Sequence, residues 1–357
     1  MGIRFDRDSR RATNGPMIFF SILKDETFEE EIRNAFISGL SFYAYRFPND
    51  SMMSYGSSEG YMEGIGTPGF VIGMYDPEKP FITIPYDGIK RPDKSLSLYE
   101  MPLQSTSYED YSYEVEEIIK DIKEQKGSKV VAARTIVEES PVDIAEKFYD
   151  LCQKFPEAFV YCFSTPATGC WVGASPELLL SGNNFSLHSM ALAGTRPSNI
   201  NFPWDEKNLK EQKIVSDYIC EIFENEGLHA IIKDTYTKSA GAIEHICTPI
   251  EISLPENYKL DIETIIRKLS PTPALCGFPK EFALKEIKRL EKFDRGCYGG
   301  FCGPFHSLKD FHFNVVLRGS SLTEQRECYY IGGGITAFSN VSEEWKETQL
   351  KYQAMIK

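Results

Sequence analysis

The chain has 357 residues, 42% of them hydrophobic, which is enough to bury a large core. Its formal net charge of −13 disfavours a nucleic-acid partner, because contacts with phosphates need clustered lysines and arginines. The longest apolar runs, such as 17–23, are too short to cross a bilayer, and the polar N-terminus lacks a signal-peptide core. Nine cysteines without a Cys-x-x-Cys pair favour a reducing compartment over a zinc ribbon. We therefore expect a cytoplasmic protein without a membrane partner, as a monomer or a weak dimer.

Along the chain, the first predicted elements are two strands, and helices and strands alternate irregularly after them. Runs at 70–76 and 81–87 flank Pro-Glu-Lys-Pro and predict a hairpin. An amphipathic pattern predicts a helix over 113–127, and the apolar run 128–139 predicts a buried strand. Strand-like runs fill most of 159–195. Further helices are predicted at 142–155, 208–227, 261–269, 280–293 and 342–356.

The order of these elements has no regular strand–helix–strand rhythm. This predicts an α+β fold with large, mainly antiparallel sheets. The sequence shows no internal repeat, low-complexity tract or flexible linker, so we expect residues 1–357 to form a single domain.

Two charged residues sit beside apolar strands. Lys129 precedes the run Val-Val-Ala-Ala-Arg; a lysine there is either solvated or held in a cleft, where its amine could act as a base. Glu177 lies between a Ser-Pro turn and an apolar strand. It is either a rim carboxylate or an inward-facing acid whose pKa is raised by burial, so that it can donate a proton.

Glutamates on two predicted helices form a second candidate group. Glu211 lies one turn into its helix, and Glu344 and Glu347 share a face of the last helix. One interpretation is structural: acidic residues stabilise helix N-termini, and Glu347 forms an i,i+4 pair with Lys351. The other is that the three carboxylates bind a hard divalent cation such as Mg²⁺.

An arginine and three glycines complete the candidates. Arg318 ends an apolar strand and could clasp a carboxylate, or lie at the surface. The glycines 332–334 allow a backbone to approach a ligand closely, or simply form a turn. The histidines show no metal-ligand spacing, and the chain has no phosphate loop.

The order of motifs is more specific than any one of them. From residue 128 to the C-terminus the chain resembles the chorismate-utilising enzymes, which include isochorismate and salicylate synthases and the large subunits of anthranilate and aminodeoxychorismate synthases. Residues 1–110 resemble no family and form the variable N-terminal part, while 128–357 carry the motifs. The motifs are KVVAAR, GASPELLL, ALAGTRP, LKEQKIV, SPTPALCGFPKEFALKEI, EKFDRGCYGGFCGP, NVVLRG, IGGGIT and EEWKETQLKYQAM.

The resemblance implies a fold, a substrate, a metal and residue roles. The fold would be an α/β sandwich of two large antiparallel sheets around a central cleft that binds chorismate and Mg²⁺. Lys129 would activate water for attack on ring C2, and Glu177 would protonate the departing C4 hydroxyl. The metal ligands would be Glu211, Glu344 and Glu347. The substrate would contact Gly194, Thr195, Tyr298, Arg318, Gly333, Gly334 and Lys351.

The same resemblance indicates which reaction to expect. Relatives that use ammonia lack the lysine at position 129, and aminodeoxychorismate synthases carry a nucleophilic lysine where this chain has Ala193. We therefore expect an isochorismate synthase that supplies menaquinone or siderophore biosynthesis. The alternatives are a salicylate synthase, which also eliminates pyruvate, an ammonia-using synthase subunit, and a chorismate-binding homologue without catalysis.

One position departs from the family pattern. Relatives usually read His-Pro-Thr-Pro-Ala where this chain reads Ser-Pro-Thr-Pro-Ala from Ser270. We expect Ser270 to face the substrate ring near the C4 hydroxyl, where its hydroxyl or a water would replace the imidazole at some cost in rate.

Overall fold

The computed structural model describes residues 25–90, 98–124, 127–198, 202–241, 243–256 and 258–356. The apolar run 17–23 lies outside these residues. Among the described residues, no helix is long and apolar enough to cross a membrane. All nine cysteines are buried free thiols.

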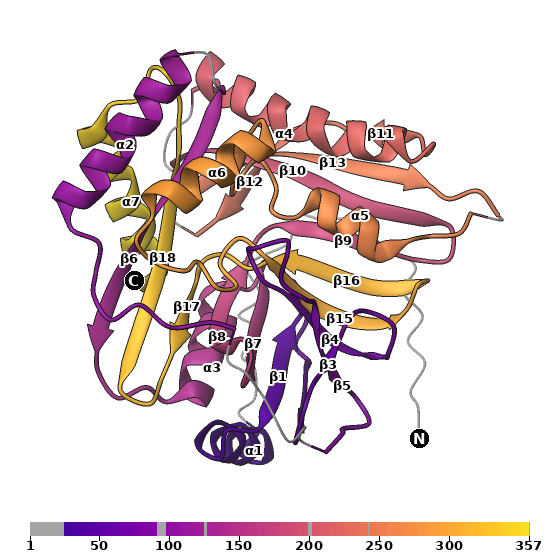
Figure 1. The fold of residues 1–357 in the computed structure, drawn as a ribbon. Coiled ribbons are helices and arrows are strands. Elements are labelled where there is room, and N and C mark those ends of the chain that lie inside the picture. Colours follow the sequence, from indigo (N-terminus) through magenta and orange to yellow (C-terminus); the bar gives the residue numbers. More distant parts are fainter. Residues whose placement is uncertain are drawn as a thin grey trace.

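The α+β class and its two large antiparallel sheets are confirmed (Figure 1). The first sheet has eight strands in the order β14-β6-β18-β17-β8-β7-β1-β2. These strands are β14 (Gly277–Phe278), β6 (Lys129–Glu139), β18 (Arg326–Ile335), β17 (Gly319–Leu322), β8 (Gly169–Ser175), β7 (Phe159–Thr165), β1 (Ser41–Arg46) and β2 (Met53–Ser58).

The second sheet has ten strands, nine of them in the order β11-β13-β10-β9-β16-β15-β4-β5-β3, with β12 also paired to β13. They are β11 (Ala230–Ile232), β13 (Ile243–Ser253), β10 (Ser186–Pro197), β9 (Leu178–Gly182), β16 (Asp310–Val315), β15 (Phe301–Ser307), β4 (Gly69–Gly73), β5 (Ile82–Pro85), β3 (Met62–Glu63) and β12 (Tyr236–Ala240). The predicted hairpin is the antiparallel pair β4–β5.

Seven helices lie in the described residues. They are α1 (Glu26–Ile37), α2 (Tyr108–Lys123), α3 (Ile144–Lys154), α4 (Glu206–Asn225), α5 (Ile262–Leu269), α6 (Lys280–Leu290) and α7 (Val341–Ile356). In Figure 1, α4 runs over β10 and β13, while α2, α6 and α7 gather beside β6 and β18.

Helices α1 and α2 differ most from the sequence analysis. Helix α2 begins at Tyr108, five residues before the predicted start, because Ser107 caps it by accepting from the backbone N–H of Asp110 at 3.0 Å. The apolar pattern marks only the buried face, so it missed this polar first turn. Helix α1 was not predicted, although Asp25 caps its start and Phe28 and Ile32 are spaced as on one helix face.

Apolar side chains between and around the sheets hold the layers together. The largest buried cluster combines residues of the first sheet, such as Tyr161 and Trp171, with residues of the second, such as Leu187 and Phe313. A second cluster packs α1 and α3 against the first sheet, and a third packs α2 and α6 against β6. Burial of β6 on both faces explains its continuous apolar run.

Candidate active site

A cavity of about 250 Å³ lies where both sheets meet α4 and α7. Strands β6 and β18 contribute from the first sheet, and β10 and β13 contribute from the second. The cavity is lined by most of the side chains that the sequence analysis singled out: Glu177, Gly194, Thr195, Glu211, Tyr298, Arg318, Gly334, Glu347 and Lys351.

Lys129 is buried at the start of β6 rather than solvated, with only 1% of its side chain exposed. Its Nζ lies 2.7 Å from Oε1 of Glu211 on α4. Gly334 gives this pair its space, because a Cβ at that position would lie 2.8 Å from Lys129 Cε and 2.9 Å from Glu211 Oε1. The structure thus brings together the predicted base and one predicted metal ligand. It also explains the glycine at position 334, because a larger residue would collide with this pair.

Glu177 is buried in the turn between β8 and β9, with 2% of its surface exposed. Its main chain is fixed, since its carbonyl accepts from Val315 N at 3.0 Å and from Asn314 Nδ2 at 3.0 Å. Its Oε1 forms no hydrogen bond with any described residue. Burial raises the pKa of Glu177 to about 8, against the opposing effects of Lys129 and other cations. A carboxyl in this state is protonated at neutral pH and can act as an acid.

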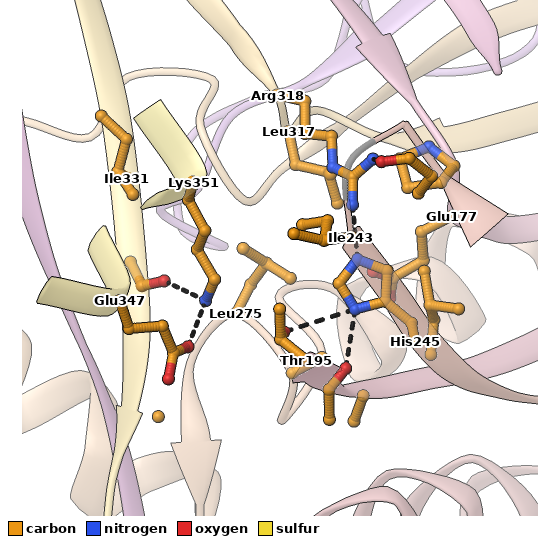
Figure 2. Close-up of a pocket in the computed structure, with 18 of the residues that line it drawn as sticks. Glu177, Thr195, Ile243, His245, Leu275, Leu317, Arg318, Ile331, Glu347 and Lys351 are labelled. Atoms are coloured by element: carbon orange, nitrogen blue, oxygen red, sulfur yellow. Dashed lines mark hydrogen bonds and ion pairs between the residues drawn. The ribbon is translucent and has the colours of Figure 1, made fainter. Parts of the chain in front are cut away.

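Glu344 and Glu347 lie on α7, which packs beside β18 at the cavity. Glu347 Oε1 lies 2.8 Å from Lys351 Nζ (Figure 2). The positive charge of Lys351 is the main reason why the pKa of this carboxyl is lowered. Lys351 also donates to the carbonyl of Gly332 at 2.9 Å. Burial by itself would lower the pKa of Lys351, but Glu347 outweighs it and the pKa is raised. Lys351 is therefore a retained positive charge at the cavity wall.

Glu344 lies deeper, beside the glycines of β18. A Cβ on Gly333 would lie 3.3 Å from Glu344 Oε2, and Lys207 Nζ lies 3.6 Å from Glu344 Oε1. Burial, with the negative charge of Glu347, raises the pKa of Glu344. A cation bound beside these carboxylates would relieve that cost.

The donor set of Glu211, Glu344 and Glu347 fits Mg²⁺ in chemistry, because it offers carboxylate oxygens only. Glu211 and Glu344 lie against consecutive glycines, 334 and 333. Each of the three glutamates contacts a lysine, and within the described ranges no three acidic, histidine or cysteine side chains converge as a metal-ligand cluster. The ligands to Mg²⁺ therefore stay a prediction.

Arg318 and His245 form a pair on the opposite wall of the cavity (Figure 2). Arg318 donates through Nη1 to the carbonyl of Ala240 at 3.1 Å and through Nη2 to His245 Nε2. Burial lowers the pKa of Arg318 to about 10, so it stays charged at neutral pH. It forms no ion pair with a described carboxylate. A buried, unpaired guanidinium is suited to receive a carboxylate from a ligand.

His245 connects this arginine to the strand β10. Its Nδ1 lies 2.7 Å from the carbonyl of Gly194 and 3.4 Å from Oγ1 of Thr195. Because a carbonyl only accepts, Nδ1 carries the hydrogen and Nε2 is free to accept from Arg318. Burial and then Arg318 lower the pKa of His245 to about 3, which keeps the ring neutral. Gly194 and Thr195 thus line the cavity and also hold His245.

The remaining predicted residues lie at the other edge of the site. Tyr298 lines the cavity and its ring stacks on Tyr330 with 5.7 Å between centroids. Ser270 is buried at the C-terminal end of α5 and is not among the residues that line the cavity. From the same loop, Leu275 lines the cavity (Figure 2). The role predicted for Ser270 stays a prediction.

Sequence analysis missed His245 and Lys207, and also Lys238, which contacts the turn of Glu177. Lys238 Nζ donates to the carbonyl of Pro176 at 2.7 Å. Lys207 had a spacing signal, because it lies one helical turn before Glu211 on the same helix, α4. His245 and Lys238 had none, because they reach the site from strands distant in sequence from the predicted residues. The pairing of β10, β12 and β13 brings His245 to the cavity wall and Lys238 to the turn that carries Glu177.

Comparison with known proteins identifies the family to which the chain belongs. Residues 87–357 match the family model described as "Chorismate binding enzyme", and the chain belongs to this family. The match begins about 40 residues before the point where the motifs start, so part of the N-terminal region assigned to no family lies within it.

Individual relatives agree with that assignment. The chain is 32% identical over 256 residues to "Isochorismate synthase 2, chloroplastic" from Arabidopsis thaliana, covering 68% of this chain and 45% of the relative. It is 30% identical to isochorismate synthase MenF from Bacillus subtilis, covering 70% and 55%. The chain therefore spans about half the length of these curated relatives.

A solved structure shows the shared fold. The menaquinone-specific isochorismate synthase MenF from Escherichia coli superposes with a TM-score of 0.74 over 89% of each chain, at 19% identity.

Proposed function

We propose that this protein is an isochorismate synthase, which adds water at C2 of chorismate and releases the C4 hydroxyl. The observation that carries this proposal is that a buried lysine, Lys129, lies close enough to a buried acid, Glu177, to lower its pKa, which burial nevertheless raises to about 8. The relatives described above are named for this activity.

The charges of the cavity suit a dianionic substrate. Arg318 and Lys351 provide two retained cations on different walls of the cavity, and each can receive a carboxylate. These local cations oppose the net charge of −13, which by itself would repel a dianion. We propose that they hold the two carboxylates of chorismate and so fix the ring between Lys129 and Glu177.

The reaction then needs two proton transfers. The amine of Lys129 accepts a proton from the water whose oxygen bonds to C2, and Glu177 gives its proton to the oxygen that leaves C4. The ring double bonds shift between these carbons, so that the product is an isomer of chorismate. The ion pair with Glu211 is made by the ammonium form of Lys129, so the lysine must lose this proton before it can act as the base.

Mg²⁺ is part of the proposal. Glu211, Glu344 and Glu347 would hold it, and the bound ion would supply positive charge for the ring carboxylate. The nucleophile in this proposal is water, because the chain has Lys129, which relatives that use ammonia lack. Ala193, where aminodeoxychorismate synthases carry a nucleophilic lysine, lines the cavity. The product would supply menaquinone or siderophore biosynthesis, in the cytoplasm.

The test is to incubate the purified protein with chorismate and Mg²⁺ and to separate the products by chromatography. Isochorismate alone, formed only when Mg²⁺ is present, is the expected result. Salicylate with pyruvate would identify a salicylate synthase instead. Turnover that requires ammonia, or binding of chorismate without turnover, would reject the proposal in favour of a synthase subunit or a non-catalytic homologue.

A further inference from the structure

Strand β12 makes two contacts with the candidate active site from the edge of the second sheet. It pairs with β13 so that Lys238 lies opposite His245. Along β12, Thr237 and Ser239 are exposed while Lys238 and Ala240 are partly buried, as expected for a strand with one face turned inward. Ala240 accepts a hydrogen bond from Arg318, and Lys238 donates to Pro176 at 2.7 Å.

The contact of Lys238 lies directly before the acid. Pro176 lines the cavity, and its carbonyl belongs to the peptide that leads into Glu177. The far side of Glu177 is held by Val315 and Asn314, as described above. Lys238 therefore supplies a second hydrogen bond on the near side, beside the one that Glu177 N donates to Ser175 Oγ at 3.2 Å. Among the described residues, Lys238 has no carboxylate ion-pair partner.

We propose that Lys238 is a positioning residue for Glu177, which fixes the Pro176–Glu177 peptide and favours loss of the acidic proton through the charge of its ammonium. This inference rests on the proposed function of Glu177 as the acid. It gives a functional role to β12, a largely exposed strand at the edge of the second sheet.

Electrostatics of the surrounding groups support the inference. Burial raises the pKa of Glu177 to about 8, and Lys129, Lys238 and Arg318 each hold this pKa below the value that burial alone would produce. A general acid with a pKa near the working pH transfers its proton most effectively. The other groups that act on Glu177 or Lys238 are Thr272 from the loop after α5, Cys247 from β13 and Glu157 from the loop before β7.

The three cations that lower the pKa of Glu177 differ in their other contacts. Lys129 is paired with Glu211, and Arg318 contacts His245 and is proposed to bind substrate. Lys238 is not among the residues that line the cavity. Its substitution should therefore change the pKa of Glu177 without removing a predicted substrate contact.

The experiment compares Lys238→Met, which keeps length without charge, with Lys238→Arg, which keeps the charge. Lys238→Gln serves as a second neutral variant if Lys238→Met does not fold. Lys233→Met is the matched control, since Lys233 is an exposed lysine between β11 and β12 that pairs with Glu251. Two quantities are measured in each variant: the alkaline limb of kcat/KM with chorismate and Mg²⁺, and the titration midpoint of Glu177. The midpoint is read by NMR with ¹³C-labelled glutamate, assigned by Glu177→Gln.

We expect both neutral variants to move the limb and the NMR midpoint to higher pH by about 0.5 to 1 unit, because a nearby positive charge is lost. Lys238→Arg and Lys233→Met should leave both values unchanged. A midpoint in Lys238→Met or Lys238→Gln that equals the wild-type value overturns the inference, even if kcat falls. The NMR titration needs no turnover, so it distinguishes this failure from failure of the proposed function.

Discussion

His245 accepts a hydrogen bond from the guanidinium of Arg318, while its other ring nitrogen donates to the carbonyl of Gly194. The neutral ring can make both contacts at once only in the tautomer with hydrogen on Nδ1. Two strands of the second sheet thereby fix the position of the arginine. Arg318 itself has a φ of 50°, a left-handed conformation that is uncommon for a residue with a side chain. Surrounding contacts must therefore hold it in place.

From this relationship we predict that His245→Asn weakens binding of chorismate. Asparagine can still donate to Gly194, but it is too short to accept from Arg318. Loss of a hydrogen bond to a charged group costs about 1.5–3 kcal/mol, so KM should rise by roughly 10- to 100-fold with a smaller change in kcat. Steady-state kinetics measures this split. His229→Asn, at an exposed histidine, is the control, and an unchanged KM in His245→Asn would contradict the role of His245.

Lys129→Ala should abolish hydration while leaving chorismate binding. Removal of a general base typically lowers the rate by about 10²- to 10⁴-fold, so kcat should fall by at least about 10²-fold. Binding of chorismate with Mg²⁺ would be followed by calorimetry. Lys210→Ala is the matched control, because Lys210 is an exposed lysine of α4 that pairs with the exposed Glu206. Retained hydration in Lys129→Ala would remove this residue from the base role.

The activity should fall as the pH rises through about 8. Glu177 must be protonated to act as the acid, and its raised pKa means that the protonated form predominates below about pH 8 and is lost above it. His245 adds no limb between pH 5 and 9, because its pKa is lowered to about 3. A profile of kcat against pH, together with the loss of its alkaline limb in Glu177→Gln, measures the effect. Activity that holds steady to pH 10 would exclude Glu177 as the acid.

Gly334→Ala should impair the site through packing alone. The added methyl would lie 2.8 Å from Lys129 Cε and 2.9 Å from Glu211 Oε1, which forces the ion pair apart. Both atoms belong to the outer parts of side chains that can shift, so folding stability should change little, whereas kcat should fall because the amine of Lys129 is displaced. Thermal unfolding and kinetics together measure the two effects. Gly66→Ala is the control, since nothing lies within 4 Å of a Cβ there. Wild-type activity in Gly334→Ala would show that the pair tolerates displacement.

Much of the fold could be predicted from local patterns. The helix over 208–227 and the last helix appear with ends shifted by one or two residues, because caps such as Asp205 extend a helix beyond its apolar stripe. Helix α1 and strands β11 to β13 were not predicted, although α1 has an N-cap and an apolar stripe. Strand β12 is largely exposed, so its sequence lacks the apolar pattern that marks a half-buried strand.

The sequence by itself determined which side chains are available: a lysine at 129, a glutamate at 177, three helix-borne glutamates and an arginine at 318, in the order of one enzyme family. Only the tertiary structure decided their states. Burial of Glu177 raises its pKa, and Glu211 pairs with Lys129 across 82 positions of the chain. His245 and Lys238 enter the site because strand pairing joins distant segments, and no local pattern encodes which segments will meet. Desolvation and contact are properties of the assembled core, so the chemistry of these residues appears only once the sheets are packed.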